Sequence, residues 1–438
     1  MELPEKIYMV GIGGIGMSAL AQLLVSKGKD VSGSDRSESP TTELLAKKGI
    51  KVTFGHGNIP DGTELLIYSD AVWGDNPERK EAKEKGIPQI SYFEALGEVS
   101  KGMRTIAVAG THGKTTTTGM LTKILVDAGA KPTAIIGSIV KDFKSNFVAG
   151  NSDLFIVEAC EYKDHLLKLS PEILVITNVE YDHTDFFPSL KEVQETFRKA
   201  AEAVSANGYI VCNPSDANLL PVLSAKGGSA SGGKNIKAKI VDYTQKAVGN
   251  LQLAGEFNRE NARAALAAAL AIMPDLSPEA AVKSLSQFQG SWRRFEFKGE
   301  TSGGALVYDD YAHHPTAVKK TIEMAHEKFP GKKIIVAFHP HLFSRTRDLM
   351  DGFAESLATA DEVILAPIFA AREEPIEGVT SDVLAGKISF LGTPVKAFAS
   401  LHEIYLHLTR SSKLEASTLL ITMGAGDIYK VAEQITEE

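Results

Sequence analysis

Short candidate strands recur along the chain, and helix-compatible segments separate them. In the first hundred residues they lie at 7–10, 30–35, 51–54, 64–68 and 87–90. Others follow at 104–109, 154–161, 173–178, 306–310, 333–338, 362–365 and 418–422. Most of these runs are continuously apolar, which is typical of strands buried on both faces of a parallel sheet. The alternation of strands and helices therefore predicts an α/β fold.

The length of 438 residues favours three domains, at a prior of about 150 residues per domain. We place them at residues 1–102, 103–297 and 298–438. A low-complexity stretch at 225–234 is expected to be a surface loop. The net charge of -8 argues against a protein that binds nucleic-acid backbones. Two cysteines without paired spacing, and the lack of a long apolar segment, favour a cytoplasmic protein that does not enter membranes.

A glycine-rich loop follows the candidate strand at 104–109 and precedes a helix-compatible segment at 119–126. Such a loop aims backbone N–H groups and the positive end of a helix dipole at one point, which suits a nucleotide phosphate. Lys114 would add a mobile cation, and the Thr115 hydroxyl could hold Mg²⁺. Val108 stands where the ordinary Walker A pattern has its first glycine, so the loop is a shortened form. Its candidate phosphate-binding residues are Gly110, Thr111, His112, Gly113, Lys114, Thr115 and Thr116.

A second glycine motif opens the chain. Gly11, Gly13 and Gly16 form a G-x-G-x-x-G pattern with Gly14 inside it, and Asp35 stands 19 residues after Gly16. This is the Rossmann arrangement that cradles a pyrophosphate and binds a ribose hydroxyl. Taken alone it indicates an NAD-dependent dehydrogenase, although the same geometry binds other nucleoside diphosphates.

Acidic and imidazole side chains follow two of the central candidate strands. Glu158 closes one of them, and His183 comes shortly after the other. Because ligands collect at the carboxyl ends of parallel strands, both could complete the ligand shell of Mg²⁺. The structural alternatives are a surface ion pair for Glu158 and an ordinary loop histidine for His183.

Polar clusters also occur in the last third of the chain. Asn258 and Asn261 share a helix face and suit either helix capping or recognition of a base, while Arg293 and Arg294 suit phosphate oxygens. Histidines gather at 313, 314, 339 and 341. A zinc site there is disfavoured, because prolines place these histidines on strand-end loops and no paired Cys/His spacing supports a closed shell.

Together these motifs resemble the Mur ligases of bacterial cell-wall synthesis, nearly end to end. The Asp309–Pro315 run and the His341–Asp348 segment are more specific than either glycine loop. The resemblance implies a Rossmann-like N-terminal domain for a UDP-sugar, a central P-loop ATPase-type domain for ATP and Mg²⁺, and a Rossmann-like C-terminal domain for an amino acid. It further implies an ATP-dependent, amide-bond-forming ligase that joins L-alanine to UDP-N-acetylmuramate through an acyl phosphate. That reaction serves peptidoglycan precursor synthesis, and with it cell shape and division.

The resemblance also assigns roles to single residues. The catalytic set would be Lys114, Glu158, His183 and Arg294, and the metal ligands would be Thr115, Glu158 and His183. The nucleotide would contact the phosphate loop together with Asn261, Arg294 and Asp310. The substrates would contact Gly13, Gly14, Gly16, Ser34, Asp35, Ser69, Tyr311, His313, His341 and Arg345.

The chain departs from the family pattern at a few positions. Leu342 stands where an arginine is usual, which leaves Arg345 as the remaining arginine for a substrate carboxylate. Phe257 and Cys160 replace a histidine and an aspartate, and Phe197 lies where other Mur ligases carry a carbamylated lysine. A branch of the family that attaches a preformed tripeptide to the same UDP-sugar is the nearest alternative. A nicotinamide dehydrogenase and a non-enzymatic nucleotide sensor are the others, and the oligomeric state stays open.

Overall fold

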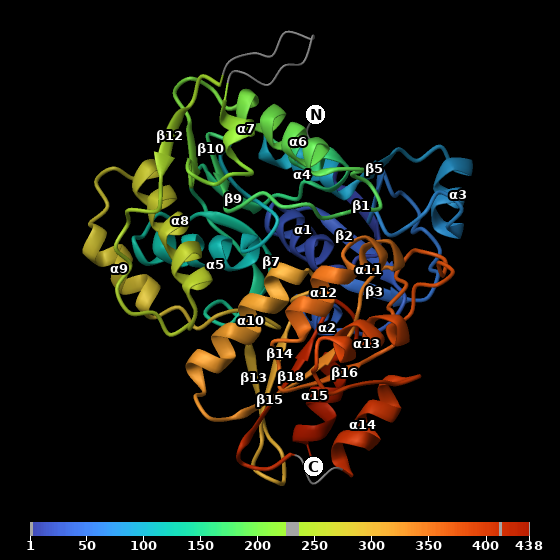
Figure 1. The fold of residues 1–438 in the computed structure, drawn as a ribbon. Coiled ribbons are helices and arrows are strands. Elements are labelled where there is room, and N and C mark those ends of the chain that lie inside the picture. The colour runs from blue at the N-terminus through green and yellow to red at the C-terminus, as the bar shows by residue number, and fades with distance from the viewer. Residues whose placement is uncertain (1–2, 225–235, 411–413, 438) are drawn as a thin grey trace. The chain divides into compact units, whose positions relative to one another are not determined.

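The computed structural model describes residues 3–224, 236–410 and 414–437, so the low-complexity stretch at 225–234 lies outside the described residues. The chain divides into two compact units (Figure 1). The first unit comprises Met1–Glu180, Lys191–Gln252 and Glu260–Gln289. The second comprises Tyr181–Leu190, Leu253–Arg259 and Gly290–Glu438.

The first unit opens with a parallel five-stranded sheet in the order β3-β2-β1-β4-β5. Its strands are β1 (Lys6–Val10), β2 (Asp30–Asp35), β3 (Lys51–Phe54), β4 (Leu65–Tyr68) and β5 (Gln89–Ser91). Its helices are α1 (Ile15–Ser26), α2 (Pro40–Lys47), α3 (Pro77–Glu84) and α4 (Tyr92–Ser100). The strand order reverses between β1 and β4, which is where open α/β sheets bind ligands.

A seven-stranded sheet completes the first unit in the order β12-β11-β10-β6-β9-β7-β8. Its strands are β6 (Arg104–Ala109), β7 (Thr133–Val140), β8 (Ser145–Val148), β9 (Leu154–Glu158), β10 (Ile173–Ile176), β11 (Tyr209–Cys212) and β12 (Lys239–Asp242). Its helices are α5 (Lys114–Asp127), the 3₁₀ helix η1 (Tyr162–Lys168), α6 (Leu190–Ala203), α7 (Leu220–Leu223), α8 (Glu256–Ile272) and α9 (Pro278–Ser286). Helix α8 begins in the second unit and continues in the first.

The second unit is built on a six-stranded sheet in the order β13-β14-β18-β15-β16-β17. Its strands are β13 (Glu296–Glu300), β14 (Leu306–Asp310), β15 (Lys333–Phe338), β16 (Glu362–Leu365), β17 (Val395–Ala397) and β18 (Thr418–Met423). Its helices are α10 (Pro315–Lys328), α11 (Phe343–Asp348), α12 (Met350–Leu357), α13 (Ser381–Phe390), α14 (Leu401–Thr409) and α15 (Tyr429–Thr436). Only β13 runs antiparallel among these described strands.

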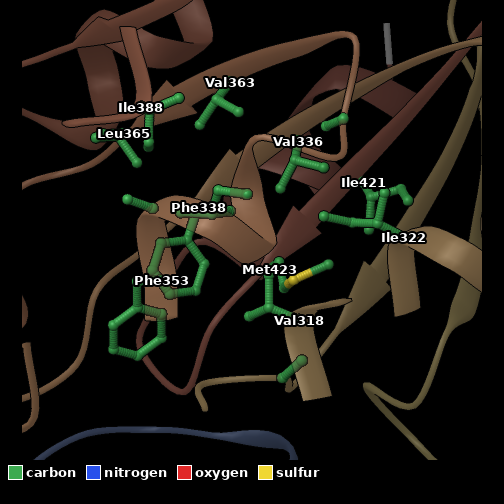
Figure 2. Packing of buried hydrophobic residues seen from close by; sticks show 14 of the residues in the cluster. Val318, Ile322, Val336, Phe338, Phe353, Val363, Leu365, Ile388, Ile421 and Met423 are labelled. Carbon is green, nitrogen blue, oxygen red and sulfur yellow. The ribbon is translucent and has the colours of Figure 1, made fainter. Parts of the chain in front are cut away.

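Successive residues of the central strands of this sheet enter two different cores. Val336 and Phe338 of β15 pack with α10, α12 and α13, and Phe338 lies beside Phe353 (Figure 2). Ile335 and Ala337 of the same strand pack on the opposite face with α14 and α15. Because both faces are covered, the strand is apolar from Ile334 to Phe338, and this continuous apolar run is what predicts it from the sequence.

The α/β class, the three sheets and most of the expected strands are confirmed. The expectation was wrong in some details. Helix α5 begins at Lys114 rather than at residue 119, and β9 ends at Glu158 rather than at 161. The β7–β8 hairpin was not anticipated, because Gly137 and Ser138 interrupt the apolar run of β7 and β8 is short and partly polar. The domain boundaries at 102/103 and 297/298 stay predictions.

Within the first unit, α1 packs against the β7–β8 hairpin of the second sheet. Buried polar side chains join them: Asn146 Nδ2 donates to Ser18 Oγ at 2.9 Å, and Gln22 Nε2 donates to Asn146 Oδ1 at 3.0 Å. Buried polar groups need such partners to offset their desolvation, so the contact is specific in register.

Arg293 fastens together several loops of the second unit. Its Nε donates to Asp309 Oδ2 at 2.7 Å, and its two terminal nitrogens donate to the carbonyls of Gly426 and Gly424 at 2.9 and 2.6 Å. Arg293 is 3% exposed and Asp309 is fully buried. The backbone of Arg293 also adopts a φ of 58°, which residues other than glycine rarely adopt.

We expect Arg293→Ala to lower the free energy of unfolding by about 3 kcal/mol or more, because it leaves Asp309 buried without its partner. Urea denaturation followed by circular dichroism measures this loss. Lys387→Ala is the matched control, since it breaks an exposed ion pair with Asp351 in the same unit. Equal losses in the two variants would contradict the role given to Arg293.

Candidate active site

The phosphate loop depends on two glycines that have close neighbours. Gly110 has a φ of 129°, and a Cβ there would lie 2.1 Å from Thr177 Oγ1. Gly113 has a φ of 80°, and its Cβ would lie 2.2 Å from Asn261 Oδ1. Both positions therefore require glycine, for conformation and for space. Asn261, expected near the nucleotide base, packs directly on the loop.

Side chains that follow β10 hold the loop in shape. Asn178 Oδ1 accepts from the backbone N–H of His112 at 2.9 Å, and the Thr177 hydroxyl donates to the His112 carbonyl at 2.5 Å. The Thr111 hydroxyl accepts from the Glu180 N–H at 2.8 Å. The His112 N–H, the His112 carbonyl and the Thr111 hydroxyl are thus used in hydrogen bonds that stabilise the loop itself. The donors best suited to phosphate are therefore at the start of α5, where the first intrahelical bond joins Thr117 N to Gly113 O.

Lys114 is folded back onto this loop. Its Nζ donates to the Gly110 carbonyl at 2.5 Å and the Thr111 carbonyl at 3.1 Å, and it lies 3.3 Å from Glu161 Oε2. Glu161 is 1% exposed, so this ion pair is poorly screened by solvent. The pair keeps an ammonium group at the mouth of the helix, where phosphate oxygens could replace the carboxylate.

Thr115 and Glu158, both expected to bind magnesium, are brought together. The Thr115 hydroxyl donates to Glu158 Oε1 at 3.1 Å, and the N–H of Gly137 donates to Glu158 Oε2 at 2.8 Å. A hydroxyl and a carboxylate beside the phosphate loop are the hard oxygen ligands that Mg²⁺ prefers, so these residues fit the ion. Gly137 allows the arrangement because a Cβ there would lie 2.2 Å from Glu158 Oε2.

His183, the third expected metal ligand, belongs to the second unit. Its backbone has a φ of 53°, and its N–H donates to Asp182 Oδ1 at 2.7 Å. The N–H groups of Phe186 and Phe187 donate to its carbonyl at 2.8 and 2.9 Å. This turn fixes the backbone on either side of the imidazole, and the role of His183 as a ligand stays a prediction.

A buried polar cluster forms in the second unit from residues expected to bind the amino acid. Arg345 Nε donates to Asp182 Oδ1 at 2.8 Å, and Arg345 Nη1 donates to His341 Nδ1 at 3.1 Å. Burial by itself would raise the pKa of the Asp182 carboxyl, but the Arg345 guanidinium holds that pKa well below its usual range. Arg345 is therefore already paired inside the protein, which the sequence did not indicate.

The two histidines of this cluster present opposite hydrogen-bonding atoms. His313 Nδ1 lies 2.8 Å from the Tyr311 carbonyl and must donate to it, which leaves Nε2 as an acceptor. His341 Nδ1 accepts from Arg345, which leaves Nε2–H as a donor. Burial and the Arg345 charge lower the pKa of His341 to about 3 and that of His313 well below its ordinary value. Both rings are therefore neutral at physiological pH.

Tyr311 joins this cluster to Arg294 and Asp310, since its ring lies 5.2 Å from that of His313. The Asp310 carboxylate accepts from the N–H groups of Phe295 and Ala312 at 2.7 Å each. Burial raises the pKa of Asp310 to about 6, although Arg294 opposes the shift. The Arg294 guanidinium lies 5.1 Å from the centre of the Tyr311 ring. The charge of Arg294 therefore acts on Asp310, and the nucleotide contacts of both residues stay predictions.

Leu342 precedes α11 with a φ of 70° and is 1% exposed. Its N–H donates to the Phe369 carbonyl at 2.9 Å, and Phe369 stacks on His341. An arginine at position 342 would have to enter a buried position. The leucine is thus part of the packing that supports His341.

The glycine motif after the first strand makes close contacts with neighbouring side chains of the same sheet and its helices. The Gly13 N–H donates to Asp35 Oδ2 at 2.7 Å, and a Cβ on Gly16 would lie 2.7 Å from the Tyr92 ring. Ser34 is buried at the end of β2, and its role in substrate binding stays a prediction. Gly14 lies in the loop, and Ser69 packs against Gly11. These residues share the edge expected to bind the UDP-sugar.

Family profiles match the chain in three consecutive parts. Residues 6–104 match the Mur ligase family catalytic domain, 108–269 the Mur ligase middle domain and 293–426 the Mur ligase glutamate ligase domain. This chain is a member of the Mur ligase family. The dehydrogenase alternative drawn from the first glycine motif is therefore not supported.

The Mur ligase resembles characterised relatives over nearly its whole length. It is 38% identical to the UDP-N-acetylmuramate–L-alanine ligases of Clostridium botulinum strain Langeland and Clostridium novyi, covering 98% and 99% of this chain and 97% of each relative. The crystal structure of UDP-N-acetylmuramate-alanine ligase from Thermotoga maritima matches with a TM-score of 0.79 and 28% identity, covering 99% of this chain and 98% of that one. A murein peptide ligase from Psychrobacter arcticus shares the fold, with a TM-score of 0.73 and 22% identity.

Several residues of this candidate site were missed in the sequence. Glu161 and Asp182 lie close to Glu158 and His183 in the chain, but no local pattern tells which carboxylate binds a metal and which pairs with a cation. Gly137 lies in a strand and carries no motif. Such residues can be found only once the strands that carry them are placed side by side.

We expect Gly137→Ala to raise the Mg²⁺ concentration needed for half-maximal activity about tenfold or more, because the new methyl displaces Glu158. Mg²⁺ titration at saturating ATP measures this change. Gly386→Ala is the control, since a Cβ there meets no heavy atom within 4 Å. An unchanged Mg²⁺ requirement in Gly137→Ala would return Glu158 to a structural role.

Proposed function

We propose that this Mur ligase joins L-alanine to UDP-N-acetylmuramate and consumes ATP. Its near full-length similarity to ligases of that name supports the proposal. The observation that carries it is the cluster of the second unit, where Arg345, His341 and His313 combine two donors with one acceptor. A free amino acid has a carboxylate that needs donors and an amine that needs an acceptor. The two ends of L-alanine therefore match this cluster.

The reaction proceeds by activation of a carboxylate. A carboxylate is a poor acyl donor because its leaving group would be oxide. Transfer of the γ-phosphoryl group of ATP to the lactyl carboxylate forms an acyl phosphate and releases ADP. The uncharged amine of L-alanine then attacks the carbonyl carbon, and inorganic phosphate leaves as the amide forms.

Several residues are assigned tasks in the activation of the carboxylate. The N–H groups at the start of α5 bind phosphate oxygens, and Lys114 exchanges Glu161 for the phosphoryl group as negative charge gathers there. Thr115 and Glu158 would hold Mg²⁺, which neutralises phosphate charge when bound. His183 is the third proposed ligand, and its assignment rests on its position in the sequence. Asn261 and the Arg294–Asp310 pair are assigned to the nucleotide.

The glycine motif of the first sheet is assigned to the UDP portion of the sugar nucleotide. Gly13, Gly14 and Gly16 would approach the diphosphate, and Asp35 and Ser69 would contact the uridine or the sugar. The cytoplasmic location and the independence from nucleic acid and membranes stay predictions. No helix among the described residues is long and apolar enough to cross a membrane.

Phosphate release tests the function directly. The assay contains ATP, Mg²⁺ and UDP-N-acetylmuramate, with either L-alanine or the cell-wall tripeptide as the amine donor. We expect sustained release with L-alanine and little with the tripeptide. The reverse preference would favour the tripeptide-adding branch, and no release with either amine would contradict a ligase of this type.

We expect Lys114→Ala to lower the ligation rate about a hundredfold or more, because it removes about 3 kcal/mol of transition-state stabilisation. Steady-state kinetics on the folded variant measures the loss. Lys123→Ala provides a control on the same helix, since Lys123 pairs with Asp127 away from the loop. Near-normal turnover in Lys114→Ala would refute the assignment of the phosphate loop.

A further inference from the structure

The segment Tyr181–Leu190 follows β10 in the chain but belongs to the second unit. Two ion pairs hold it there. Asp182 pairs with Arg345, and Asp185 Oδ2 lies 2.5 Å from Arg372 Nη2. In addition, His314 Nε2 lies 3.1 Å from the Tyr181 carbonyl. The segment is thus fixed to the unit that carries the proposed amino-acid site.

The two ion pairs differ in their surroundings. The side chains of Asp182 and Arg345 are 6% and 3% exposed, whereas those of Asp185 and Arg372 are 14% and 30% exposed. Taking two charges out of water costs several kcal/mol for each ion, and a hydrophobic pair of the same size is often as stable. The buried pair therefore keeps a charged guanidinium group, with its donors, in a poorly hydrated part of the second unit.

Asp182 sets the direction in which Arg345 presents its donors. The bond from Nε to Asp182 fixes one edge of the guanidinium plane, and the bond from Nη1 to His341 fixes a second direction. Among the described residues no hydrogen bond to Arg345 Nη2 is found, so this nitrogen remains for a ligand. The same bond to His341 selects the tautomer with a proton on Nε2.

We propose that Asp182 is a positioning residue for the amino-acid substrate, acting through Arg345 and His341 on the carboxylate of L-alanine. The proposal rests on the proposed function. Asp182 does not touch the substrate in this arrangement. Its carboxylate compensates the buried charge of Arg345 and holds the guanidinium plane, so that Nη2 is directed to the substrate carboxylate.

The test is the kinetic response of Asp182→Asn and Asp182→Ala. Asparagine keeps an acceptor for Arg345 Nε but loses the charge, and alanine loses both. We expect the KM for L-alanine to rise about tenfold in Asp182→Asn and further in Asp182→Ala. The KM for ATP and the Mg²⁺ requirement should change less than twofold. Asp185→Asn is the matched control on the same segment, and its KM for L-alanine should stay at the wild-type value.

A double-mutant cycle separates positioning from a general structural effect. If Asp182 acts through Arg345, Arg345→Ala combined with Asp182→Ala should raise the KM for L-alanine no further than Arg345→Ala alone. Additive effects would overturn the proposal. A rise in the Mg²⁺ requirement that matches the rise in KM would also overturn it, because it would place the effect at the neighbouring His183.

The wild-type kinetics distinguish failure of the positioning role from failure of the proposed function. If wild type ligates L-alanine and Asp182→Ala binds it with an unchanged KM, the positioning role fails while the function stands. If wild type does not use L-alanine, the proposed function fails first. Should Asp182→Ala fail to fold, as judged by its thermal melt, the nearly isosteric Asp182→Asn carries the test.

Discussion

Close approach of backbone to functional side chains is the constraint on which the site of the first unit depends. At Gly110, Gly113 and Gly137 a Cβ would lie only about 2.2 Å or less from a side-chain oxygen. The absence of side chains lets Thr177 and Asn261 pack on the phosphate loop and lets Glu158 lie against β7. Any larger residue would move the loop or the carboxylate by more than the tolerance of a catalytic geometry.

A second principle is that three cations of the protein, which have little contact with solvent, each lie next to a carboxylate. Lys114 pairs with Glu161, Arg345 with Asp182 and Arg293 with Asp309. In a poorly hydrated interior an unpaired charge would be costly, so the partner keeps the cation ionised and in place. For Arg345 the partner also determines which nitrogen is available to an anionic ligand. Arg293, by contrast, donates its hydrogen bonds to groups of the protein itself and stabilises the loops of the second unit.

The histidines of the second unit show why electrostatics must be considered together with hydrogen bonding. His313 and His341 are both neutral, yet one offers an acceptor and the other a donor. The difference comes entirely from the partner of Nδ1, which is a carbonyl in one case and a guanidinium in the other. Neutral rings of opposite polarity can hold the two ends of an amino acid without adding charge to a buried site.

By itself the sequence determined the α/β class and most central strands, because strands buried on both faces are apolar without interruption. It also determined the two glycine loops, since conformation and phosphate binding are local requirements that leave a local pattern. The β7–β8 hairpin left no such pattern, and neither did the early start of α5. Only the tertiary structure decided that Glu161 faces Lys114, that Gly137 supports Glu158 and that Arg345 is paired with Asp182. These pairs join residues far apart in the chain, and which carboxylate meets which cation depends on how strands and loops are brought together in space.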